Sequence, residues 1–130
     1  MPRDVADFFE QYRQAFNRLD GDAIADLYCV PSGIVSDCGL TAWLSREPIA
    51  KNMVALCALY RANGYKHAHF EPNHFISQGA DFAIADIAWT IERESDAESW
   101  QFHTTYNLRR TAEGWRVVLC TAYEEKRLNA

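Results

Sequence analysis

Residues 59–70 read Leu59-Tyr60-Arg61-Ala62-Asn63-Gly64-Tyr65-Lys66-His67-Ala68-His69-Phe70, and this stretch decides the fold. Before it, apolar residues recur every three or four positions, which is the period of an amphipathic helix. After it the helical period disappears and extended, β-type patterns take over. Asn63-Gly64 marks the boundary, because glycine accepts the left-handed conformation in which many helices end.

Two helices are predicted at the start of the chain. The first has Asp4 as its N-cap and one apolar stripe, formed by Val5, Phe8, Phe9, Tyr12, Phe16 and Leu19. The second is shorter, with Asp22 as its cap and Tyr28 on its buried side, and Pro31 ends it.

A short hairpin and a third helix follow. Extended segments at 33–37 and 40–44 flank Cys38-Gly39, where glycine permits a tight reversal. Ser45 then caps a helix that runs to the Asn63-Gly64 boundary, and Pro48 is tolerated in its first turn.

Four β runs are predicted downstream, at about 66–77, 81–93, 99–110 and 115–124. Their linkers are short, so neighbouring strands must run antiparallel and form a meander. Three helices packed against one face of this sheet make an α+β fold. With 130 residues, the chain fits a single domain that spans residues 1–130.

Composition narrows the classes of function. The formal net charge is −5 and no basic cluster exceeds two residues, which argues against nucleic-acid binding. No run approaches the ~18 apolar residues of a membrane span. The N-terminus lacks the apolar segment of a signal peptide, so a cytoplasmic location is expected.

Four cysteines, at positions 29, 38, 57 and 120, include no C-x-x-C pair. Their spacing matches neither a zinc site nor a compact disulfide framework. Buried, reduced thiols that act as small hydrophobic groups are therefore predicted.

Three stretches, taken in order, resemble the nuclear transport factor 2-like superfamily, in particular its SnoaL-like and ketosteroid isomerase-like branches. They are Tyr12 with Leu19-Asp20-Gly21-Asp22-Ala23-Ile24 and Leu27-Tyr28, then Asn73-His74 with Gly79-Ala80-Asp81-Phe82-Ala83, then Glu113-Gly114-Trp115-Arg116-Val117-Val118. The resemblance implies a cone-shaped domain with a pocket between the helices and a curved antiparallel sheet. Members of this superfamily include isomerases, cyclases, dehydratases, epoxide hydrolases and non-catalytic binding or assembly proteins, so the fold does not choose the function.

The resemblance also implies two catalytic candidates. Asp37 falls near the position where ketosteroid isomerase-like proteins carry their general base, and Tyr106 falls where they carry an acidic oxyanion donor. A carboxylate beside a phenol suits proton abstraction next to a carbonyl group. Tyr12 lies about two positions from the place of the isomerase tyrosine, so the full isomerase triad is absent.

The pocket lining is predicted from the alternation along the strands. The mostly apolar face of 99–110 is expected to point inward. On the last strand, every second residue from Val117 to Tyr123 is expected to point inward as well. The lining expected for a small apolar ligand is Tyr12, Trp43, Trp89, Trp100, Thr104, Leu119 and Tyr123.

The outer face of the sheet is expected to be polar near His67, His69 and Glu71. These three alternate along one strand, but the outer two would lie roughly 13 Å apart, too far to share a metal ion. No metal and no cofactor are therefore predicted. A homodimer is expected through the part of this face that carries Thr105, Asn107, Val118, Cys120 and Ala122.

Two functions remain open at this point. One is a cofactor-independent acid–base enzyme of the isomerase, cyclase or dehydratase type, acting on a small apolar carbonyl compound. The other is a non-catalytic ligand-binding or assembly module. They differ in whether Asp37 and Tyr106 reach one cavity, since an isolated Asp37 at the surface favours the module.

Overall fold

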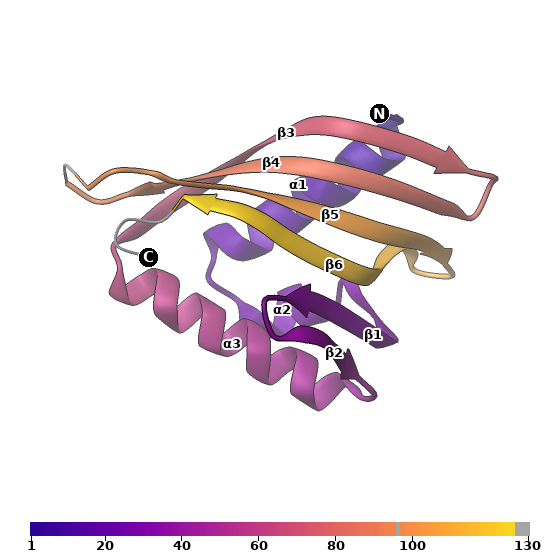
Figure 1. Ribbon diagram of the computed structural model, residues 1–130, viewed down its shortest axis with the longest axis horizontal. Coiled ribbons are helices and arrows are strands. Elements are labelled where there is room, and N and C mark those ends of the chain that lie inside the picture. Colours follow the sequence, from indigo (N-terminus) through magenta and orange to yellow (C-terminus); the bar gives the residue numbers. More distant parts are fainter. Residues whose placement is uncertain (96, 127–130) are drawn as a thin grey trace.

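Six strands form one curved sheet in the order β2-β1-β6-β5-β4-β3 (Figure 1). The computed structural model describes residues 1–95 and 97–126, the last two by their backbone alone. The strands are β1 (Tyr28–Ser36), β2 (Gly39–Trp43), β3 (Tyr65–Gln78), β4 (Phe82–Arg93), β5 (Trp100–Thr111) and β6 (Gly114–Lys126). The four-stranded antiparallel meander β3–β6 is confirmed.

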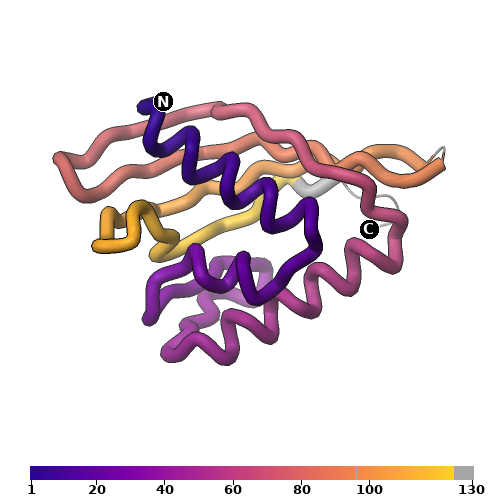
Figure 2. Tube along the Cα trace, turned by 180° about the vertical axis from the view of Figure 1, so that it is seen from behind, coloured from indigo at the N-terminus to yellow at the C-terminus, as the bar shows by residue number. Residues whose placement is uncertain are grey.

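Three helices pack on one side of this sheet, as predicted. They are α1 (Arg3–Asn17), α2 (Gly21–Ala25) and α3 (Arg46–Ala62). Helix α1 runs across the inner face of the long strands, and α3 lies beside α2 and the β1–β2 hairpin (Figure 2). Gly21 allows α2 to approach α3 closely, because a Cβ atom there would lie 2.7 Å from the backbone nitrogen of Val54. The α+β class is therefore confirmed.

The second helix is shorter than predicted, and its cap is different. Asp20, not Asp22, is its N-cap, and the Asp20 carboxylate accepts a hydrogen bond from the amide of Ala23 at 3.0 Å. The helix ends at Ala25, and Tyr28 already belongs to β1, where it pairs with Val117. Pro31 lies inside β1 and does not end a helix.

The first helix also begins differently, and Pro2 takes the N-cap position. Asp4 lies in the first turn, where its carboxylate accepts hydrogen bonds from Trp115 Nε1 at 3.0 Å and from Arg110 at 3.2 Å. These bonds lower the pKa of Asp4, the one from Trp115 contributing most. Asp4 therefore ties α1 to β5 and β6 instead of capping its own helix.

The sheet is mixed and not wholly antiparallel. The predicted hairpin exists, with β1 and β2 antiparallel around Asp37-Cys38, but β1 runs parallel to β6. About 90 residues separate these two strands in the chain, so their pairing could not be predicted from the short linkers between neighbouring strands.

A β-bulge in β6 reverses the side-chain alternation. Leu108 pairs with Val117 and Asn107 with Leu119, so Val118 is an extra residue in β6. Val117 is buried in the core, and beyond the bulge it is Cys120 and Ala122 that face inward. The inward placement expected for Leu119, Thr121 and Tyr123, and the outward placement expected for Cys120 and Ala122, are both wrong for this reason.

All four cysteines are unpaired, as predicted. Cys57 and Cys120 are buried, whereas Cys29 is half-buried and Cys38 is exposed, so the expectation of burial holds for two of them. Within the described part of the chain, no helix combines the length and the apolar character needed to cross a membrane.

Candidate functional site

A cavity of about 380 Å³ lies between α1, α3 and the inner face of the sheet. Its wall is formed by aromatic and aliphatic side chains from these elements, together with the Asn52 amide and the Thr104 hydroxyl. Asn52, Ala55 and Leu59 of α3 line the cavity and are also exposed to solvent. The mouth of the cavity therefore runs along α3.

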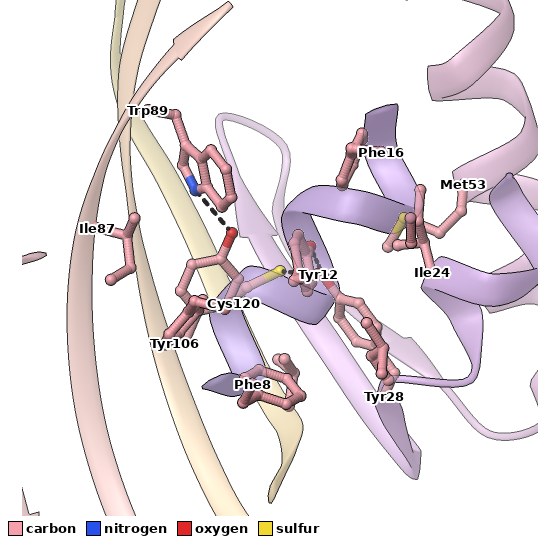
Figure 3. Close-up of a cluster of buried hydrophobic side chains, with 14 of the residues drawn as sticks. Phe8, Tyr12, Phe16, Ile24, Tyr28, Met53, Ile87, Trp89, Tyr106 and Cys120 are labelled. Carbon is pink, nitrogen blue, oxygen red and sulfur yellow. Dashed lines mark hydrogen bonds between the residues drawn. The ribbon is translucent and has the colours of Figure 1, made fainter. Parts of the chain in front are cut away.

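Three tyrosines cluster at the inner end of the cavity (Figure 3). The hydroxyl groups of Tyr12 and Tyr28 form a hydrogen bond of 2.8 Å, and Tyr28 Oη lies 3.6 Å from the sulfur of Cys120. Trp89 Nε1 donates a hydrogen bond to the hydroxyl oxygen of Tyr106 at 3.0 Å. The Tyr106 hydroxyl also interacts with the side chains of Tyr12 and Thr104. The cluster therefore presents hydroxyl groups inside an apolar cavity.

Burial determines the protonation states of these groups. Burial raises the pKa values of Tyr12, Tyr28 and Tyr106 well above that of an ordinary tyrosine, so all three are neutral near pH 7. Burial also raises the pKa of the Cys120 thiol to about 11. The sulfur is therefore a thiol and not the thiolate that a nucleophile requires. The polar groups of this end of the cavity can donate and accept hydrogen bonds, but none is a base at neutral pH.

Four of the predicted site residues lie on the cavity wall: Tyr12, Trp89, Thr104 and Tyr106. Trp43 and Trp100 are buried behind this wall and do not line it. Trp43 packs edge-on against Tyr28, with ring centroids 5.9 Å apart, and Trp100 packs against Tyr60 at 5.8 Å. Both tryptophans support residues that line the cavity.

Asp37 does not reach the cavity. It lies in the exposed turn between β1 and β2, and it is not among the residues that line the cavity. The expectation that Asp37 and Tyr106 share one cavity is therefore wrong. Tyr28 and Ile34 of β1 line the cavity, whereas Asp37 follows the end of this strand in an exposed turn.

Leu119 and Tyr123 are also absent from the cavity, because the bulge at Val118 turns them to the outer face. The sequence reasoning in turn missed Cys120 and Ala122, which line it. A signal for the bulge was present, since Val117-Val118-Leu119 places three apolar residues in succession and breaks the expected alternation. Tyr28 was missed because it was assigned to a helix.

The outer face of the sheet holds a second polar network, centred on Asp86. This carboxylate is 6% exposed and accepts hydrogen bonds from Asn73 at 2.8 Å, Thr105 at 2.9 Å and Tyr123 at 2.7 Å. His103 stacks on the Tyr123 ring, with centroids 5.3 Å apart. Burial acts to raise the pKa of Asp86, but these hydrogen bonds outweigh it and the pKa lies below its ordinary value. The carboxylate is thus ionised, and its hydrogen bonds connect β4, on which it lies, to β3, β5 and β6.

Comparison with known proteins places this architecture in a family. A family model described as NTF2-like protein (DUF6841) matches residues 3–125. The chain belongs to this NTF2-like family. A search of curated proteins found no significant match.

Solved structures agree with this assignment at the level of the fold. A domain of unknown function with a cystatin-like fold from Nostoc punctiforme has a TM-score of 0.74 and 16% identity, and the match covers 96% of this chain and 77% of that one. An NTF-2 like protein from Shewanella oneidensis has a TM-score of 0.72 and 15% identity over 92% and 95% of the two chains. A ketosteroid isomerase-like protein from Erwinia carotovora has a TM-score of 0.65 and 15% identity over 91% of each chain. At these identities the likeness concerns the fold alone.

Proposed function

We propose that this NTF2-like protein binds a small, neutral and largely apolar molecule in the cavity between its helices and its sheet. The observation that carries the proposal is the composition of the cavity wall. Among the described residues that line it there is no carboxylate, imidazole, guanidinium or ammonium group. Pockets for small molecules typically have ~300–1,000 Å³ and a mostly apolar wall with a few polar groups, and this cavity of about 380 Å³ lies near the lower end.

The tyrosine cluster defines the polar part of the ligand. A neutral phenol in an apolar cavity donates a hydrogen bond to a carbonyl or hydroxyl oxygen. Tyr106 is suited to this role, because its oxygen accepts a hydrogen bond from Trp89, and a ligand oxygen would compete with Tyr12 and Thr104 for its proton. The ligand class is therefore a compact apolar molecule with one oxygen near the inner end of the cavity.

An acid–base reaction through Asp37 is not supported by this arrangement. The catalytic hypothesis needs a base within hydrogen-bonding reach of the substrate, about 2.6–3.2 Å between heavy atoms. Asp37 lies outside the cavity lining, and the tyrosines and Cys120 inside it are protonated at neutral pH. The position of Asp37 therefore favours the binding module over the enzyme.

Two matched probes test the proposal. 2-Naphthol carries a hydroxyl group and naphthalene does not, and binding of either to the protein is measured by equilibrium dialysis. Tyr106→Phe should weaken 2-naphthol binding roughly 2- to 10-fold, the equivalent of one neutral hydrogen bond, and leave naphthalene binding unchanged. Equal loss for both probes would contradict the assigned role of the Tyr106 hydroxyl.

A second pair of variants tests the location of binding. Ala55 and Ala58 are both exposed on α3, but only Ala55 lines the cavity. Ala55→Trp should obstruct the mouth and reduce binding of both probes, whereas Ala58→Trp should have no effect. Native mass spectrometry of freshly purified protein then tests for a retained natural ligand. If wild-type protein binds neither probe and retains no small molecule, the proposal fails.

A further inference from the structure

Two histidines and a glutamate converge on the outer face of the sheet, away from the cavity. His67 and His69 lie on β3, and Glu92 lies on β4. His67 Nε2 is 2.9 Å from Glu92 Oε2, and His69 Nε2 forms a hydrogen bond to the same oxygen. The three potential donor atoms all lie within 4.8 Å of one another.

Strand register brings these residues together. His67 stands directly opposite Glu92 in the antiparallel pair, and His69 follows two positions later on the same face. Directly paired and diagonal side chains on one face lie about 5 and 7–8 Å apart at their bases, within reach of long side chains. Glu71, which alternates with the two histidines, lies too far along β3 to bind the same metal ion as His67. Glu92 of β4 supplies the carboxylate instead. The neighbouring strand supplies the third ligand that a single strand cannot.

The contact contributes little to folding by itself. The three side chains are 36%, 53% and 43% exposed, and ion pairs at such positions contribute about 0–1 kcal/mol. The two imidazole rings lie edge to face with centroids 4.5 Å apart, and the Nε2 atom of each contacts the same carboxylate oxygen of Glu92. Stability alone therefore gives no reason for this convergence.

We propose that His67, His69 and Glu92 form a binding site for a divalent first-row transition metal such as zinc. Imidazole nitrogen and carboxylate oxygen bind zinc at about 2.0–2.2 Å, which places adjacent ligand atoms about 3.4 Å apart in a tetrahedron. His67 Nε2 and Glu92 Oε2 are 2.9 Å apart and all three donor atoms lie within 4.8 Å of one another, so small rotations of these exposed side chains bring them to this spacing. Three protein ligands leave a fourth position for water or for a group from a binding partner. This set of donors suits zinc, nickel or copper better than magnesium or calcium, which prefer oxygen ligands.

Zinc titration of the full chain, after removal of bound metal by a chelator, tests the site. A competing chromophoric chelator should report one Zn²⁺ per chain, and Mg²⁺ should not displace it. His69→Ala or Glu92→Gln should weaken zinc binding at least about tenfold, since even residues that only orient a metal ligand contribute 10–100-fold. Circular dichroism of each metal-free variant verifies that it is folded.

Two controls distinguish this site from other zinc ligands. His74 is exposed on the same strand and on the same face, and Cys38 is an exposed thiol. His74→Ala and Cys38→Ser should both bind zinc like the wild type. The proposal is overturned if wild-type protein binds no zinc at stoichiometric ratio. It is also overturned if the double variant His67→Ala, His69→Ala binds zinc as tightly as the wild type, or if Cys38→Ser abolishes binding.

Discussion

Asp86→Ala removes a carboxylate that joins the four long strands of the sheet. Asn73 of β3, Thr105 of β5 and Tyr123 of β6 all donate to it, and Asp86 itself belongs to β4. A hydrogen bond to a charged acceptor contributes about 1.5–3 kcal/mol, and breaking a buried charged network costs about 3–5 kcal/mol. The three donors are only partly buried, so water satisfies them in part, and we expect a loss of about 3 kcal/mol.

Thermal and urea unfolding, followed by circular dichroism, measure this loss. For a domain of this size a loss of 3 kcal/mol lowers the melting temperature by about 10 °C. Asp81→Ala, an exposed carboxylate just before β4, is the control and should stay within about 0.5 kcal/mol of the wild type. A change of less than 1 kcal/mol for Asp86→Ala would refute the reasoning.

The pH dependence of stability tests the same network independently. The native pKa of Asp86 lies below its unfolded value of ~3.9, because its hydrogen bonds favour the charged form. Its contribution is therefore fully present above about pH 4 and is lost as the pH falls through the native pKa. Wild-type protein should lose stability below about pH 4 more steeply than Asp86→Ala. Parallel stability curves in acid would contradict this account.

Three further outcomes are expected. Asp37→Asn should leave both the melting temperature and the binding of the probes unchanged, because Asp37 is exposed and lies outside the cavity. Weaker binding of the probes would show that Asp37 contributes to the binding site. Gly21→Ala should destabilise the protein by about 1–3 kcal/mol in urea unfolding, because the added methyl group would meet the backbone of Val54; unchanged stability would mean that α2 and α3 separate freely. We also expect a homodimer through the outer sheet face, where Ile76 and Phe82 are 56% and 50% exposed, and light scattering at micromolar concentration that gave 14.9 kDa would contradict it.

Much of the fold was predictable because it follows from local pattern. The change of period near Tyr65 separates helices from strands, and short linkers between strands leave an antiparallel meander as the simple solution. The helical period placed Tyr12 on the buried stripe of its helix, and alternation along the strands placed Trp89, Thr104 and Tyr106 on the inner face of the sheet; all four lie on the cavity wall. These features depend on neighbours in the chain, so the sequence by itself determined them.

Three other features were decided only by tertiary structure. The extra residue Val118 shifts the alternation of β6 by one position, so residues after the bulge point to the opposite face from the one predicted. As a result Cys120, and not Tyr123, lines the cavity. The length of the β1–β2 hairpin places Asp37 in solvent, although its position in the chain suggested a catalytic base. The register of β3 against β4 brings Glu92 to His67, 25 residues away in the chain. Each depends on which strands meet and in what register, and that is set by the packing of the whole domain.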